Sequence, residues 1–155
     1  MDFERVEGVE GVLIANQITN VDDTQEGLPK IVESFISFDD GRLWDPIAAP
    51  YVDSLGKPYP GCAAPSDGCS LHVHTMAEGR MHGNVFSSSS APGLMVAVGN
   101  VGTSLRAYET CSTFLSTDGG VTWKEVQKKP HLFEFGDRGS IIVLVPDGEL
   151  TDMLQ

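Results

Sequence analysis

The sequence contains few basic residues. Lys and Arg number 10 against 22 Asp and Glu in 155 residues, so the formal net charge at pH 7 is -12. Binding to nucleic acid needs a basic surface, and that class of partner is therefore not expected. Long apolar runs are also missing, because none approaches the roughly 18 to 20 residues that span a bilayer. The first residues, MDFERVEGVEG, are too acidic and polar for a signal peptide.

Helical periodicity is almost absent as well. The apolar runs are short and rich in β-branched residues, with turn residues between them; they include GVLIANQI, KIVESFISF, GLMVAVGNV and SIIVLVP. Seventeen Gly and nine Pro agree with many turns. Such runs are typical of strands, so the sequence predicts an all-β fold.

An internal repeat organises the expected strands. Residues 11–44 read as a Gly-led apolar strand, a polar loop and then ESFISFDDGRLW, and residues 93–123 follow the same order to STFLSTDGGVTW. A third copy opens with GSIIVLVPD. A repeated four-stranded unit is typical of the blades of a β-propeller.

Each of the two complete copies ends on an octapeptide of the form Ser-x-Asp-x-Gly-x-x-Trp. The Gly takes positive φ at low cost and suits a tight hairpin. The Asp, and more weakly the Ser, accepts hydrogen bonds from backbone N–H groups two residues on. The Trp buries its ring and its indole N–H needs an acceptor. The residues are Ser37, Asp39, Gly41 and Trp44, then Ser116, Asp118, Gly120, Thr122 and Trp123.

These octapeptides are expected to be structural turns rather than catalytic sites. Acid–base chemistry needs a second carboxylate or a nucleophile, and nothing in the pair supplies one. A catalytic site also rarely occurs twice in so short a chain. The sequence therefore assigns no catalytic residue and no cofactor.

Three cysteines leave the redox state open. Cys62 and Cys69 lie close together in the loop PGCAAPSDGCS, and Cys111 stands apart. A local disulfide fits this spacing and would indicate an oxidising compartment, whereas composition alone is equally compatible with reduced thiols. A zinc site with His72 and His74 is a third alternative. The Cys-x6-Cys spacing is wide for a zinc knuckle, and the two histidines are expected to be ordinary strand residues that share one face.

The octapeptides resemble the Asp-box, the hairpin motif of sialidases and related β-propellers, with Leu43 where Thr is usual in the first copy. Longer segments resemble the Vps10 domain, the luminal ligand-binding domain of sortilin-type receptors, and most of all that of fungal vacuolar protein sorting receptors. The resemblance runs from about residue 3 to residue 147. It is carried by FERVEGVEGVLIANQI, ISFDDGRLW, CSLHVHTM, APGLMVAVGNVG and the stretch from GVTWKEV to GSIIVLVPD.

The resemblance implies a piece of a ten-bladed propeller, an all-β fold of which the chain holds two to three blades. A first blade is expected at about 3–50, an insert loop with the cysteine pair at 51–70, a second blade at about 71–128 and the start of a third at about 131–147. An incomplete ring is expected to leave Trp44, Trp123 and the IIVLV run facing water. The luminal setting of the family favours a disulfide between Cys62 and Cys69.

The function that the resemblance implies is binding without chemistry. The family's receptors carry vacuolar hydrolase precursors, of the carboxypeptidase Y type, from the late Golgi to the endosome. They do so from the lumen, as single-pass membrane proteins, so the chain is expected to be a segment of a larger receptor. An acidic surface would suit basic stretches of cargo, although solubility is the simpler reason for the charge.

Two other functions remain open from the sequence. A sialidase-like glycoside hydrolase needs an Arg cluster or paired carboxylates, and a purely structural propeller needs no ligand. The five arginines are scattered among loops and turns, which does not favour the hydrolase: Arg5, Arg42, Arg80, Arg106 and Arg138.

Overall fold

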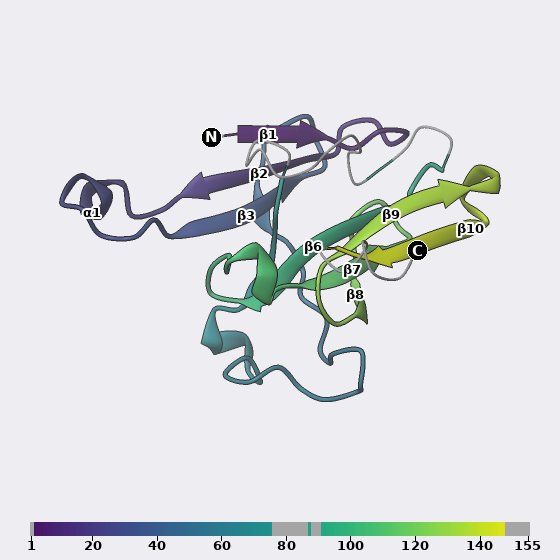
Figure 1. Cartoon of the computed structure of the whole chain (residues 1–155). Coiled ribbons are helices and arrows are strands. Elements are labelled where there is room, and N and C mark those ends of the chain that lie inside the picture. The colour runs from purple at the N-terminus through teal and green to yellow at the C-terminus, as the bar shows by residue number, and fades with distance from the viewer. Residues whose placement is uncertain (1, 76–86, 88–90, 148–155) are drawn as a thin grey trace.

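The computed structural model describes residues 2–75, 87 and 91–147, and its strands form three antiparallel sheets in chain order (Figure 1). The all-β class predicted from the sequence is confirmed. Helices are short in the described ranges: α1 (Val21–Gln25) and the 3-10 turns η1 (Pro65–Asp67), η3 (Tyr108–Thr110) and η4 (Asp137–Gly139). None of the helices in those ranges has the length and apolar character to cross a membrane.

The first sheet has the order β1-β2-β3-β4. Its strands are β1 (Asp2–Arg5), β2 (Leu13–Ile18), β3 (Val32–Ser37) and β4 (Asp45–Pro46), and α1 lies in the connection from β2 to β3. The register pairs Ile14 with Ile36 and Ala15 with Phe35. Because side chains alternate along a strand, Ile14 and Ile36 share one face and Phe35 lies on the other.

The second sheet repeats this plan with the order β5-β6-β7-β8. Its strands are β5 (Ser70–Val73), β6 (Met95–Gly102), β7 (Ser112–Ser116) and β8 (Lys124–Gln127). All eight residues of β6 are buried, since structure covers both faces of this sheet. A third, two-stranded sheet pairs β9 (His131–Gly136) with β10 (Ile141–Pro146). It is tied to the second sheet by hydrogen bonds from Thr113 Oγ1 to the Lys129 carbonyl and from the Tyr108 hydroxyl to Asp147.

The main hydrophobic core lies between the first and second sheets. Ile14 and Ile36 on the inner face of the first sheet belong to one buried cluster with the aliphatic and aromatic side chains of the second sheet. Burying a side chain of this size contributes about 1.5–3 kcal/mol. The second sheet supplies Leu71, Val73, Met95, Ala97, Val101, Phe114 and Trp123.

The expectation that both tryptophans face water is wrong for Trp123, which is only 6% exposed. It belongs to the core cluster that includes Ile14 and Ile36 of the first sheet, whereas Trp44, at the same place in the first repeat, is half-buried. The phenylalanines of the two repeats show the same contrast, since Phe114 is fully buried and Phe35 half-buried. The first sheet packs on the face of the second sheet that carries Phe114 and Trp123, whereas the matching face of the first sheet has no such cover among the described residues. Residues at matching positions of the two repeats are therefore buried to different extents. In the IIVLV run, Ile141 and Val143 are about half exposed, in line with the expectation.

Gly120, in the second octapeptide turn, lies against Ile36 of the first sheet. Its φ is +95°, and a Cβ there would lie 2.7 Å from Ile36 Cδ1. We expect Gly120→Ala to destabilise by more than the about 1–2 kcal/mol of a left-handed backbone alone. Gly56→Ala is the matched control, because Gly56 has φ of +80° and nothing within 4 Å of the added atom. Thermal unfolding of both variants measures the difference, and equal melting temperatures would contradict a steric role for Gly120.

Candidate functional site

The serines of the two octapeptides lie at the centre of their turns. Ser37 Oγ donates to Asp39 Oδ1 at 2.9 Å and accepts the Gly41 N–H at 2.8 Å. The same two bonds recur at 2.8 and 2.9 Å between Ser116, Asp118 and Gly120. The serine oxygen also accepts the N–H group two residues on, at 3.4 and 3.5 Å, which is the weaker bond expected from the sequence. The shorter bond from the glycine N–H was not expected.

The aspartates accept backbone hydrogen bonds further along the chain than expected. Asp39 Oδ1 accepts the N–H groups of Arg42 and Leu43 at 3.1 and 2.9 Å, and Asp118 Oδ1 accepts that of Thr122 at 2.9 Å. The acceptor reaches three and four residues on, not two, because two successive residues with positive φ, 60° and 87° in the first turn, tighten the loop. In the second turn the Thr122 hydroxyl also donates to Asp118 Oδ2.

Each tryptophan closes its own turn. The indole N–H donates to the carbonyl of the octapeptide glycine at 3.0 Å in both copies, from Trp44 to Gly41 and from Trp123 to Gly120. The motif side chains of each octapeptide thus bond within their own turn, which is the property of a structural device.

The hydrogen bonds also set the charge of the turn carboxylates. The Leu43 N–H and then the Ser37 hydroxyl lower the pKa of Asp39. Burial raises the pKa of Asp118, but bonds from Thr122 and Ser116 outweigh it, and the pKa of Asp118 is also lowered. A general acid or base works best with a pKa near the operating pH. These carboxylates are tuned away from that value.

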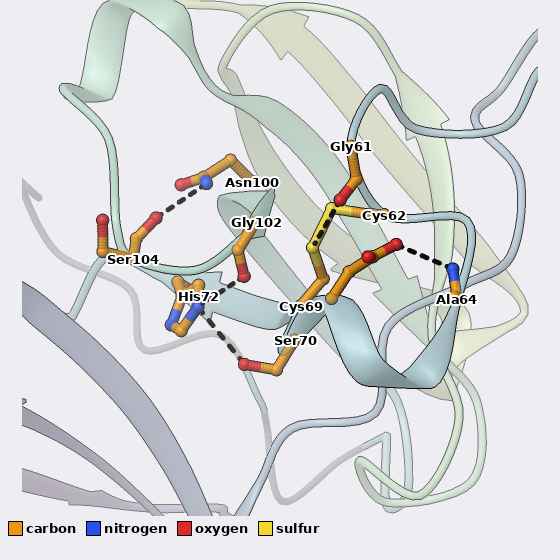
Figure 2. The surroundings of a disulfide bond; sticks show 10 residues. Gly61, Cys62, Ala64, Cys69, Ser70, His72, Asn100, Gly102 and Ser104 are labelled. Carbon is orange, nitrogen blue, oxygen red and sulfur yellow. Dashed lines mark hydrogen bonds between the residues drawn. A yellow bond between two sulfur atoms is a disulfide. The ribbon is translucent and has the colours of Figure 1, made fainter.

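Of the three alternatives for the cysteine loop, the structure has the disulfide. Cys62 and Cys69 are joined by a disulfide (Figure 2), with their Cα atoms 5.7 Å apart. Cys111 is free and buried. The Ala64 N–H donates to Asp67 at 2.8 Å inside the same loop. The described residues hold no cluster of three or more His, Cys, Asp or Glu side chains that would suit a metal ion.

His72 lies in strand β5, and its side chain makes contacts that the sequence does not predict. Its side chain is buried, and Nδ1 accepts the backbone N–H of Ser34 in the first sheet at 3.0 Å. Nε2 therefore carries the proton of the neutral ring and faces the Gly102 carbonyl at 3.0 Å and the Ser70 hydroxyl at 3.2 Å (Figure 2). Burial lowers the pKa of His72. The ring is a neutral bridge between the two sheets.

Ser34 and Asn16 complete this buried polar bridge. Ser34 Oγ accepts the Val73 N–H at 2.9 Å and donates to Asn16 Oδ1 at 2.5 Å, and Asn16 Nδ2 donates to the Val73 carbonyl at 2.9 Å. Sequence reasoning missed these residues. The alternation of side chains along a strand could have found Asn16, because positions 14, 16 and 18 share the face that packs inward.

The insert loop (residues 51–70) is fastened to β8 by a charged clamp. The Ser54 N–H donates to Glu125 at 2.6 Å. Lys128 Nζ lies 2.9 Å from both Asp53 and Glu125, and the Glu125 side chain is only 2% exposed. An ion pair that is buried on one side and shared by three residues restrains the loop more than an exposed pair would.

The charges of the clamp are stabilised by its own bonds. The Lys57 N–H and Lys128 lower the pKa of Asp53 to about 2. Burial raises the pKa of Glu125, but bonds from Ser54, Ser112 and Lys128 outweigh it and lower the pKa overall. The clamp therefore remains charged well below neutral pH.

A pocket of about 470 Å³ opens between the chain entering the insert loop and the second octapeptide turn. Residues 48–53 form one wall and residues 122–124 the other. This size and apolar lining are typical of a recognition site. This pocket, unlike either octapeptide carboxylate, has the shape of a binding site. Another pocket, of about 490 Å³, is lined by residues 5–12.

Comparison with known proteins gives one consistent result. The family model described as Sortilin, neurotensin receptor 3 (Sortilin-Vps10) matches residues 1–155. The chain is 49% identical, over 99% of its length, to vacuolar protein sorting/targeting protein 10 of Eremothecium gossypii and covers 10% of that protein. It is 43% identical to vacuolar protein sorting/targeting protein PEP1 of Saccharomyces cerevisiae, again covering 10%. A Saccharomyces cerevisiae protein described as an uncharacterized membrane glycoprotein is 44% identical, with 14% covered. The chain thus spans about a tenth of these relatives.

The two octapeptides differ at one position, and this difference provides a reciprocal test. Leu43 is 71% exposed where the second turn has Thr122, whose hydroxyl bonds to Asp118. We expect Leu43→Thr to stabilise the fold by about 0.5–1.5 kcal/mol by adding that bond to Asp39, and Thr122→Leu to destabilise it by a similar amount. Thermal unfolding measures both. Shifts of the same sign would show that the hydroxyl bond is not the cause.

The His72 bridge predicts a pH dependence of stability. Its folded pKa lies below the unfolded value of about 6.5. The unfolded chain therefore binds the extra proton, and the stability from His72 is present above pH 6.5 and lost as pH falls below it. His72→Asn retains an acceptor for the Ser34 N–H without titrating. We expect the variant's deficit in melting temperature to shrink between pH 7.5 and 5.5; parallel curves would contradict this assignment.

Proposed function

Because the chain belongs to the Sortilin-Vps10 family, we propose that it is a ligand-binding segment of a sorting receptor for vacuolar hydrolase precursors, carrying them from the late Golgi to the endosome. The observation that carries the proposal is the match of the family model over residues 1–155, together with relatives named for vacuolar protein sorting. These relatives are about ten times longer than the chain. The activity proposed is that of the whole receptor.

The three sheets are proposed to be successive blades of the family's propeller. On this proposal the first blade covers about 3–50, the insert loop 51–70, the second blade about 71–128, part of which lies outside the described residues, and the start of a third about 131–147. Two facts support it: the sheets follow chain order, and each of the first two has four antiparallel strands. The half-buried outer face of the first sheet is then where a preceding blade packs.

The proposed place of action is the lumen of the Golgi and late endosome, with the segment held there by a single membrane span elsewhere in the receptor. The Cys62–Cys69 disulfide supports a compartment that is oxidising. The relative described as a membrane glycoprotein supports a membrane-bound receptor. Protein cargo is the proposed partner, and no cofactor is part of the proposal.

Binding is proposed to occur without catalysis. The octapeptide carboxylates already accept several hydrogen bonds within their turns, and their lowered pKa values make them weak proton acceptors near neutral pH. The glycoside hydrolase alternative would need a different pair of carboxylates. The names of the relatives describe sorting rather than hydrolysis.

A chimaera tests the proposal within a complete receptor. The matching segment of the Saccharomyces cerevisiae relative is replaced by residues 1–155, and secretion of a vacuolar hydrolase precursor is measured in cells that depend on the chimaera. We expect the precursor to be retained, as with the unmodified receptor. The control lacks the segment. A chimaera that reaches the Golgi intact yet secretes as much precursor as receptor-less cells would contradict the proposal, as would hydrolysis of sialosides by the chain.

A further inference from the structure

The pocket beside the insert loop has a mainly apolar wall. Pro50 and Val52 line one side and Trp123 the other, around a volume of about 470 Å³. Tyr51 also lines it and is 95% exposed. An aromatic side chain left in water at the mouth of an apolar pocket is typical of a protein-binding surface, where such residues form the strongest contacts.

The wall formed by the loop is fixed before any partner arrives. Asp53 accepts the N–H groups of Leu55 and Lys57 at 2.9 Å each, and Lys128 joins it to Glu125. A preformed wall avoids the entropy cost of ordering a loop on binding. The carboxylate of Asp53, although it borders the pocket, stays ionised and has its charge paired with Lys128.

One charge at the pocket is left without a partner of opposite sign. Lys124 is exposed, lines the pocket, and makes no ion pair within the described ranges of the chain. Asp53, the other charged residue that lines the pocket, is paired with Lys128. Lys124 is therefore the charge at the pocket that remains available to a partner.

We propose that this pocket binds an extended segment of protein cargo that presents an aromatic or large aliphatic side chain next to an Asp or Glu. The apolar side chain enters between Val52 and Trp123, the carboxylate pairs with Lys124 Nζ, and Tyr51 covers the bound residue. This inference rests on the proposed function for its class of partner. The pocket would select acidic segments of cargo, whereas the net charge of the chain taken alone would select basic ones.

Blocked peptides test this with the full chain immobilised at low density on a biosensor. The probes are acetyl-Gly-Asp-Phe-Asp-Gly-amide, the same peptide with Lys in place of Asp, and the same peptide with Gly in place of Phe. We expect the first to bind most tightly and to weaken as salt rises. Tighter binding of the lysine peptide, equal binding of all three, or no binding of the first at millimolar concentration would overturn the proposal.

Variants of the chain locate the binding. Lys124→Glu should weaken the acidic peptide by about fivefold, the effect of one exposed ion pair, and should favour the lysine peptide instead. Lys30→Glu is the matched control, an equal charge change at an exposed residue of the first repeat, and should leave affinity unchanged. Equal losses in both variants would show a general charge effect and overturn the site. Such a result leaves the chimaera's sorting of precursor intact, so failure of the site and failure of the proposed function are distinguishable.

Discussion

The packing of the first sheet on the second is the contact on which the rest of the structure depends. Ile14 and Ile36 bury the aliphatic and aromatic face that ends on Trp123, and the same contact buries the bonds that join His72, Ser34 and Asn16. A buried polar group costs free energy unless it is paired, so these bonds favour one alignment of the sheets over others. The insert loop begins at the end of one sheet and ends at the start of the other, and this contact therefore also places it.

The proposed binding function is separated from the most conspicuous motif of the chain. The motif side chains of the octapeptides bond within their own turns, so the motif is suited to repetition. Their carboxylates remain ionised, and their tryptophans are fixed by the glycine carbonyls. What the repeats leave available for recognition is the irregular segment between them, where the clamp of Asp53, Lys128 and Glu125 holds a loop beside a pocket. An insertion between repeated units can change one surface of a protein without changing the units themselves.

Much of the fold was predictable because its signals are local. β-Branched runs between turn residues indicate strands, and the repeat of octapeptide and Gly-led strand indicates equivalent units. The octapeptide residues were predicted to form tight turns, and their side chains bond to backbone N–H groups of those turns. Each Asp was expected to accept the N–H group two residues on, but it accepts N–H groups three or four residues on. The expectation did not include the two successive positive φ angles that shorten each turn. The pocket was not predictable, because it forms only when the insert loop meets β8.

By itself, the sequence determined the strands, their pairing into repeated units and the side-chain hydrogen bonds within each octapeptide turn. These features depend on residues within a few positions of one another. Only the tertiary structure decided which face of each sheet is covered. Trp123 is buried and Trp44 half-buried although their octapeptides are nearly identical. It also decided the roles of His72 and Glu125, whose hydrogen bonds span 38 and 71 positions. Contacts of that separation follow from the docking of whole sheets, and no short stretch of sequence specifies them.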